Sequence, residues 1–165
     1  MENAKNIRHV YADNAATTAM STAALEKMIW ALENQYGNPS SLHTVGQEAK
    51  VYLEDARARV AKCLGAADPR EIIFTSGGSE SDNTAVRSAA YNGARKGRKH
   101  LISTAFEHHA ILHTLDALKK EGFEVTLLPV SPDGFVTAEQ VRDAIRPDTA
   151  LVSGMYANNE IGTVQ

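Results

Sequence analysis

The chain has 165 residues, of which 43% are hydrophobic and 22% charged, and its formal net charge is −3. This composition is typical of one folded core, and the charge argues against a nucleic-acid or membrane-surface partner. No apolar run reaches the roughly 18 residues of a membrane span, and the N-terminus has no signal-peptide core. The single cysteine, Cys63, excludes an internal disulfide. We therefore expect a cytoplasmic protein that binds neither nucleic acid nor membranes.

The first part of the chain predicts an extended segment followed by two amphipathic helices. Residues 9–13 are typical of a short strand or an extended arm. Apolar residues at helical spacing then predict a helix over residues 21–37 with one buried face, which begins at a capping hydroxyl residue. A second helix is expected over residues 45–64, and Gly65 ends it. Cys63 lies in the last turn of this helix, where we expect a near-core residue rather than a nucleophile.

A glycine turn follows the second helix and a short apolar run. The β-branched and aromatic residues 72–75 predict a buried strand. Gly77 and Gly78 then lead into a helical pattern that starts at Ser79. The Gly78 amide, the Ser79 amide and the Ser79 hydroxyl would then be free to bind an anion at the helix N-terminus. The same residues also fit a plain tight turn in which Ser79 caps the helix.

Beyond the glycine turn, helical and strand patterns alternate. Strands are expected over residues 100–103, 124–130 and 150–155, with a helix between each pair of neighbours. A capping box over residues 137–140 opens the last of these helices. Strands separated by single helices predict right-handed crossovers and a parallel sheet, so the fold class is α/β.

Ligands of parallel sheets bind beyond the carboxyl ends of the strands, where this chain places polar residues. His108 and His109 follow one strand, and Asn158 and Asn159 follow another. A histidine can stack on or protonate a ligand, an amide can hold a ring oxygen, and the glycine turn can hold a phosphate. This pattern favours a site for a phosphorylated aromatic ligand. The alternatives are that the histidines begin a helix and that the asparagines form a plain turn.

Five segments in this order also resemble the successive motifs of one protein family. The segments are Tyr11–Thr18, Gly37–Ser41 with His43, Phe74–Asn83, Glu107–Ala110 and Asn158–Gln165. Together they are similar to the NifS/IscS-type cysteine desulfurases, which are pyridoxal-phosphate (PLP) enzymes of fold type I in the class-V aminotransferase group. The resemblance implies a three-layer α/β sandwich with a mostly parallel sheet. It further implies that residues 21–165 form the first, truncated part of the large PLP-binding domain, and that residues 1–20 are an arm that contributes to the small domain.

The resemblance also assigns roles to individual residues, with PLP as the cofactor. It implies that Gly78 and Ser79 hold the cofactor phosphate. His108 is implied to stack on the pyridine ring and take part in proton transfer, and Asn159 to hydrogen-bond the ring hydroxyl. No metal site is predicted.

Three further residues are implied to lie near the active-site entrance. They are Asn14, Asn38 and His43. Judged by pattern alone, a loop histidine such as His43 is more typical of a solvated or capping residue.

The match ends at Gln165, well under half the family's length. The chain therefore lacks the family's pyridine-pairing aspartate, Schiff-base lysine, carboxylate-binding arginine and nucleophilic cysteine, and Cys63 matches none of them. The full-length family is homodimeric and takes sulfur from L-cysteine as an enzyme-bound persulfide, leaving L-alanine. The sulfur then passes to an iron–sulfur scaffold or another acceptor protein.

We expect this chain to be an N-terminal fragment that is inactive by itself. One alternative is another class-V enzyme, such as an aminotransferase or a selenocysteine lyase. The other is a non-catalytic binding module that retains only the phosphate-binding turn.

Overall fold

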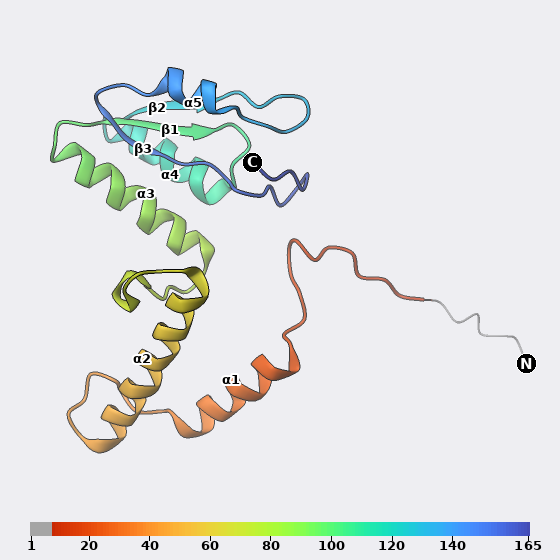
Figure 1. The fold of residues 1–165 in the computed structure, drawn as a ribbon, viewed down its shortest axis with the longest axis vertical. Coiled ribbons are helices and arrows are strands. Elements are labelled where there is room, and N and C mark those ends of the chain that lie inside the picture. The colour runs from red at the N-terminus through yellow and green to blue at the C-terminus, as the bar shows by residue number, and fades with distance from the viewer. Residues whose placement is uncertain (1–7) are drawn as a thin grey trace, which may run out of the picture. The chain divides into compact units, whose positions relative to one another are not determined.

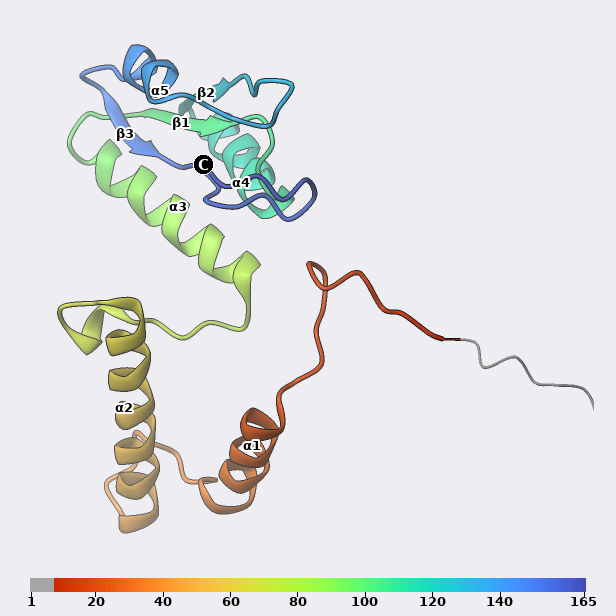
Figure 2. The ribbon, with the colours of Figure 1, turned by 45° about the vertical axis from the view of Figure 1, so that its right-hand side comes forward.

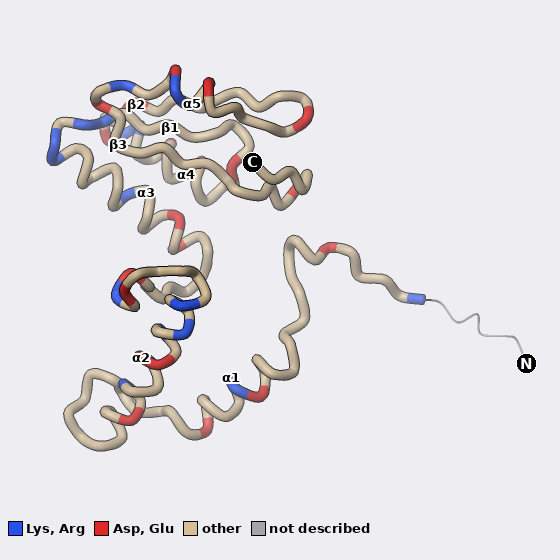
Figure 3. Tube along the Cα trace, in the orientation of Figure 1, with Lys and Arg blue, Asp and Glu red and all other residues tan. Residues whose placement is uncertain are grey.

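The computed structural model describes residues 8–165 and divides into two compact units (Figures 1 and 2). Within the described residues, the first unit ends at Phe74 and the second is Thr75–Gln165. Charged residues of both signs are spread along both units (Figure 3). Within the described residues, no helix is long and apolar enough to cross a membrane.

The first helix of unit 1, α1 (Thr22–Asn34), begins where the sequence predicts. The Ser21 hydroxyl accepts a hydrogen bond from the Ala24 amide at 3.3 Å. The helix ends at Asn34, so Gly37 lies in the loop beyond it. A Cβ atom at Gly37 would collide with the backbone of Val45, so the glycine lets two chain segments approach closely.

The apolar face of α1 is exposed, so the prediction that it is buried is wrong. The residues expected to be buried are Leu25, Met28, Ile29, Leu32 and Tyr36, and each is at least 46% exposed. Helical spacing indicates which residues share a face, but it does not supply the surface that covers that face.

The second helix, α2 (Thr44–Leu64), confirms the predicted helix and its end. Gly65 follows with φ 71°, a left-handed conformation that glycine adopts without strain. Ala49 and Ala61 are buried on this helix, whereas Cys63 is exposed, so a near-core position for Cys63 is wrong. A short 3₁₀ helix, Pro69–Glu71, follows.

Residues 72–75 are extended but form no strand, contrary to the prediction. No strand of the described chain pairs with them, and Ile73 and Phe74 are exposed. An apolar run becomes a strand only where a neighbouring strand takes up its backbone N–H and C=O groups. Here Arg57 of α2 holds the segment instead. Its guanidinium donates to the Ile72 carbonyl and lies 4.9 Å from the centre of the Phe74 ring.

Unit 2 is a three-layer α/β structure, as expected. Its elements are α3 (Gly78–Ala94), β1 (His100–Thr104), α4 (His109–Lys120), β2 (Glu124–Leu128), α5 (Ala138–Ala144) and β3 (Thr149–Val152). The strands are parallel in the order β2-β1-β3, so three of the four predicted strands form. Helix α5 lies on one face of the sheet, and α3 and α4 lie on the other (Figures 1 and 2).

The central strand β1 is buried along its whole length. Leu101 packs in a core built with α3 and α4, whose other members are Val86, Ala90, Ile111, Leu115, Leu118 and Phe123. His100 begins the strand and is 1% exposed. Its Nδ1 lies 2.8 Å from the Thr149 hydroxyl of β3, and its Nε2 lies 2.9 Å from the Thr126 hydroxyl of β2.

The predicted capping box of α5 is present. The Thr137 hydroxyl accepts from the Gln140 amide at 3.2 Å, and the Gln140 side chain accepts from the Thr137 amide at 2.7 Å. The two bonds satisfy amides that the helix itself leaves unpaired. This local signal accounts for a helix of only seven residues at its predicted start.

Candidate functional site

The N-termini of α3 and α4 point toward the carboxyl edge of the sheet in unit 2. Helix α4 starts a few residues after β1 ends, and α3 reaches the start of β1 through the short connection 95–99. The Thr114 hydroxyl of α4 donates to the Asn83 side chain of α3 at 2.7 Å. Each of these two residues is the sixth of its helix, so both helices begin about 8 Å before this contact. The two helix starts therefore lie at the same edge.

The loop after β3 is tied to the loop after β1 at this edge. The Asn158 side-chain amide donates to the Phe106 carbonyl at 3.0 Å. In the other direction, the Glu107 carboxylate accepts from the Met155 amide at 2.7 Å. The loop that contains Asn159 is thus bonded to the loop that contains His108.

Gly78 is the first residue of α3 and Ser79 the second, so Ser79 is not the helix cap. Gly77 occupies the cap position and makes no side-chain cap bond. Its φ of 165° is extended backbone that any residue can adopt, and Cβ atoms at Gly77 or Gly78 would meet no atom within 4 Å. Neither backbone conformation nor packing explains this pair of glycines. Room for a ligand close to the helix amides would explain it.

An acidic residue also lies in the first turn of α3. The Glu80 carboxylate accepts from the Ser76 amide and the Ser76 hydroxyl, both at 2.6 Å. These bonds, the hydroxyl bond first, hold the pKa of Glu80 below its usual value. The carboxylate is therefore engaged with Ser76, the residue before Gly77.

His108 is the cap of α4, as the helix-start alternative proposes. Its Nδ1 accepts from the Ala110 amide at 3.1 Å. In the neutral ring the proton therefore sits on Nε2, and that nitrogen takes no part in the cap. Because the side chain is exposed, Nε2 is accessible to a bound molecule. Capping and ligand contact thus use different atoms of one ring.

The two adjacent asparagines have different environments. Asn158 is buried, at 6% exposure, and its side chain bonds only to backbone groups. Asn159 is exposed, and its side-chain amide donates to Glu160 Oε1 at 3.1 Å. Of the two, only Asn159 presents its side chain to solvent.

The residues implied to form the entrance lie in unit 1 and make local contacts. Asn38 Oδ1 accepts from the Ser40 amide at 2.9 Å. His43 caps α2, with Nδ1 accepting from the Gly46 amide at 3.3 Å. Asn14 lies in an exposed turn. An entrance role for these three residues stays a prediction.

Sequence reasoning missed Glu107 and Asn158 as supports of the site. Both stand inside the quoted motifs, directly before His108 and Asn159. Their sequence signal is a polar residue beside a candidate residue after a strand. Only the fold shows that the pair is buried and bonded between two loops.

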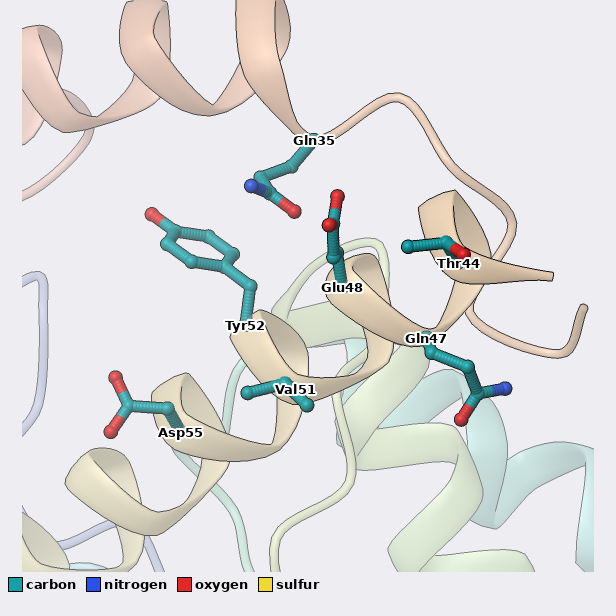
Figure 4. Close-up of a pocket in the computed structure, with 7 residues that line it drawn as sticks. All are labelled: Gln35, Thr44, Gln47, Glu48, Val51, Tyr52 and Asp55. Atoms are coloured by element: carbon teal, nitrogen blue, oxygen red, sulfur yellow. The ribbon is translucent and has the colours of Figure 1, made fainter. Parts of the chain in front are cut away.

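The lining residues of two cavities show whether either cavity contains the candidate site residues. One, of about 250 Å³, lies at the carboxyl ends of the strands and includes Thr104, Leu128, Ser153 and Gln165 in its lining. The other, of about 490 Å³, lies in unit 1 (Figure 4), where Gln35, Glu48 and Tyr52 surround the opening. Neither lining includes Gly78, Ser79, His108 or Asn159.

The fold defines a parallel α/β domain with two helix N-termini at the carboxyl edge of its sheet, and comparison with known proteins identifies its family. The model of the family described as Aminotransferase class-V matches residues 10–165, so the chain belongs to this family. It is 48% identical over 159 residues to the putative cysteine desulfurase IscS 1 of Bacillus subtilis. It is 49% identical over 158 residues to the cysteine desulfurase IscS of Clostridium botulinum. The resemblance to NifS/IscS-type proteins is thereby confirmed, and these families are PLP-dependent.

Solved structures agree in fold. A NifS-like protein superposes with a TM-score of 0.87 at 42% identity, over 93% of this chain and 42% of that one. A structure named SspA in complex with cysteine gives a TM-score of 0.85 at 39% identity, over 92% of this chain and 43% of that one. The two curated relatives are matched over 96% of this chain but only 41% and 39% of their own length. The chain thus spans about two-fifths of the curated relatives.

Proposed function

We propose that this chain supplies the cofactor-binding part of a PLP-dependent cysteine desulfurase, which takes sulfur from L-cysteine as an enzyme-bound persulfide and leaves L-alanine. The observation that carries the proposal is the joining of the His108 and Asn159 loops at the edge where α3 begins. Similarity to proteins named cysteine desulfurases supports the reaction, and the cysteine complex of a similar protein supports the substrate.

The donor groups at the start of α3 suit a phosphate. The helix N-terminus carries partial positive charge and lacks a side-chain cap, and two glycines leave the space before it open. Gly78 and Ser79 would hold the phosphate through their amides and the Ser79 hydroxyl. Asn159 would donate to the ring hydroxyl, and His108 would stack on the ring.

When bound, PLP supplies an electron-withdrawing ring that stabilises negative charge developing on the substrate carbon. The chain's own contribution is proton handling and orientation. The α4 cap bond holds the His108 ring through Nδ1 and leaves Nε2–H as a hydrogen-bond donor toward a bound molecule, so a proton-transfer role for this ring would require Nδ1 to leave the Ala110 amide.

The remaining parts of the proposal concern the whole protein. The Schiff-base lysine and the nucleophilic cysteine of the family lie outside the matched motifs, so turnover needs residues beyond these 165. A homodimer, transfer of sulfur to an iron–sulfur scaffold or another acceptor, and a cytoplasmic location belong to the same proposal. The single cysteine of the chain supports the last point.

Complementation tests the function. The chain is co-expressed with the C-terminal three-fifths of the Bacillus subtilis relative, and bound PLP and alanine formed from L-cysteine are measured. We expect both to require both chains, and we expect Ser79→Ala, but not the matched Ser88→Ala on the same helix, to lower bound PLP. A complex that binds PLP but forms no alanine would favour a non-catalytic module. A complex without PLP would refute the proposal.

A further inference from the structure

The loops of His108 and Asn159 support each other through the residue that precedes each of them. Glu107 reaches from the first loop to a backbone amide of the second, and Asn158 reaches from the second to a backbone carbonyl of the first. We call this pair of side chains the Glu107–Asn158 brace. It is reciprocal because each loop contributes one side chain and one backbone group.

Glu107 works as a hydrogen-bond acceptor within the brace. Glu107 is 8% exposed, and its Oε1 accepts from the Thr104 hydroxyl at 2.8 Å and from the Met155 amide at 2.7 Å. Across residues 8–165, no basic side chain forms a salt bridge with Glu107. Both observed bonds need an oxygen acceptor rather than a negative charge, so glutamine can replace it.

Asn158 organises its own loop and connects it to the other. Its Oδ1 accepts from the amides of Glu160 and Ile161 at 2.8 and 3.0 Å. Its backbone N–H donates to the Thr163 carbonyl, and its carbonyl accepts from the Gly162 amide, each at 2.9 Å. Only the side-chain NH₂ group leaves the loop, to reach Phe106. The loop is therefore a single hydrogen-bonded unit, and the brace connects that unit to the loop of His108.

We propose that Glu107 and Asn158 are positioning residues that hold His108 and Asn159 at a fixed separation. The proposal rests on the proposed function for the roles of His108 and Asn159, but the brace itself does not. A ligand ring that meets an imidazole on one loop and an amide on the other needs both groups in place before it binds. In the described chain, the side-chain hydrogen bonds between these two loops are those to the Met155 amide and the Phe106 carbonyl.

Amide hydrogen exchange on the 165-residue chain tests the coupling. Glu107→Ala should speed exchange about tenfold at Met155 and over residues 158–163, as loss of one net hydrogen bond predicts. Glu107→Gln should restore it, because the acceptor returns. Asn158→Asp keeps the Oδ1 acceptor but sets a carboxylate against the Phe106 carbonyl. It should therefore speed exchange at Ala110, whose amide donates to His108.

Thr149→Val is the matched control, because it removes two side-chain hydrogen bonds, those to the His100 ring and from the Arg146 amide, but at the amino edge of the sheet. It should leave the amides of both loops unchanged. If Glu107→Gln behaves like Glu107→Ala, the charge rather than the acceptor matters and the proposal is wrong. It is also wrong if each substitution affects only its own loop.

Two further readouts report position rather than stability. The ¹⁵N signals of the His108 ring should show a single Nε2-protonated tautomer in the parent chain. In Glu107→Ala they should show an average of the two tautomers, and Glu107→Gln should restore the parent spectrum. Titration of the co-expressed two-chain complex with PLP, followed by ³¹P NMR, should show weaker binding for Glu107→Ala than for Glu107→Gln. Absence of PLP binding by the parent complex would count against the proposed function, whereas the exchange data alone decide on the brace.

Discussion

Ser79 is the residue at which the phosphate-binding and the structural interpretations differ most. It is the second residue of α3, and Gly77, not Ser79, holds the cap position. Ser79→Ala should therefore leave helix stability nearly unchanged but weaken PLP retention by about 1.5–3 kcal/mol, the scale of a hydrogen bond to a charged group. Equilibrium dialysis of the reconstituted protein measures this, with Ser88→Ala as control. Equal affinity in the two variants would argue against the phosphate role.

His108 combines a cap and a proposed proton carrier, and two substitutions separate them. His108→Ala removes both and should cost about 1 kcal/mol through the lost cap. His108→Asn retains a side-chain acceptor for the Ala110 amide but has no titratable nitrogen. We expect the asparagine variant to unfold like the parent, to retain PLP, and to lose most of its turnover in the complemented enzyme. Turnover equal to that of the parent would exclude His108 as the proton carrier.

His100 makes the stability of the chain depend on pH. Burial, reinforced by the positive charge of Arg146 and opposed by Asp148 and Glu124, lowers the pKa of His100 below its ordinary 6.5. The unfolded chain therefore takes up this proton at a higher pH than the folded chain. Stability should be constant above about pH 6.5 and should fall below it, by at most about 1.4 kcal/mol per pH unit.

Urea titrations between pH 5 and 7.5 measure this dependence. The comparison is His100→Gln, which cannot titrate, and its unfolding free energy should vary less over the same range. Exposed carboxylates whose pKa values are lowered, such as Asp116 and Glu121, also stabilise the folded chain. This stabilisation is lost only at lower pH, where these carboxylates become protonated. An unchanged slope in His100→Gln would assign the pH dependence to other groups.

At the scale of residues, the sequence indicated candidate site residues but not the side chains that support them. His108 and Asn159 are candidates because they are polar residues that follow strands of a parallel sheet, where ligands bind. Glu107 and Asn158 are equally polar, and whether such a side chain is buried depends on segments about 50 residues away. Local patterns carry no information on contacts of that range.

The contact between α3 and α4 includes one polar pair beside its apolar core. The Thr114 hydroxyl donates to the Asn83 side chain, and Thr114 is 3% exposed. Thr114→Val keeps the side-chain volume but leaves the Asn83 oxygen without its donor, which should cost about 1–3 kcal/mol. The helix starts should also become less well aligned, so PLP affinity should fall. Chemical denaturation and PLP titration measure the two effects, with Thr84→Val on the exposed face of α3 as control.

At the scale of elements, the helices and parallel strands were predictable because their signals are local. The capping box of α5, the glycine after α2 and the periodicity of α4 each lie within a few residues. The two errors concern partners. Residues 72–75 have strand-like composition but no adjacent strand, and the apolar stripe of α1 has no covering surface within the described chain. A pattern predicts a shape, whereas burial requires a second surface.

The whole molecule exposes surfaces that favour self-association. In the described chain, β2 and β3 are both edge strands of a three-stranded sheet. Large apolar side chains on α1 are also exposed, Leu32 at 69%. Open edges and apolar patches promote aggregation. Size-exclusion chromatography with light scattering should therefore show species above the monomer mass of 17.8 kDa.

A variant of the α1 face locates the cause. Met28→Lys combined with Leu32→Glu should shift the chain toward the monomer if this face dominates. Association that persists in the variant would point to the sheet edges. A parent chain that stays monodisperse at 17.8 kDa across concentrations would contradict the prediction.

The His100 side chain also determines which residues of the three strands stand opposite each other. It bonds one hydroxyl on each neighbouring strand, and those hydroxyls belong to residues 26 and 49 positions further along the chain. Sliding either strand by one residue would turn its threonine to the opposite face and leave polar groups unpaired in the core. His100 thus selects the correct alignment at the amino edge, while the proposed chemistry lies at the carboxyl edge. Because the two tasks occupy opposite ends of β1, substitutions that alter strand alignment and substitutions that alter ligand binding can accumulate independently.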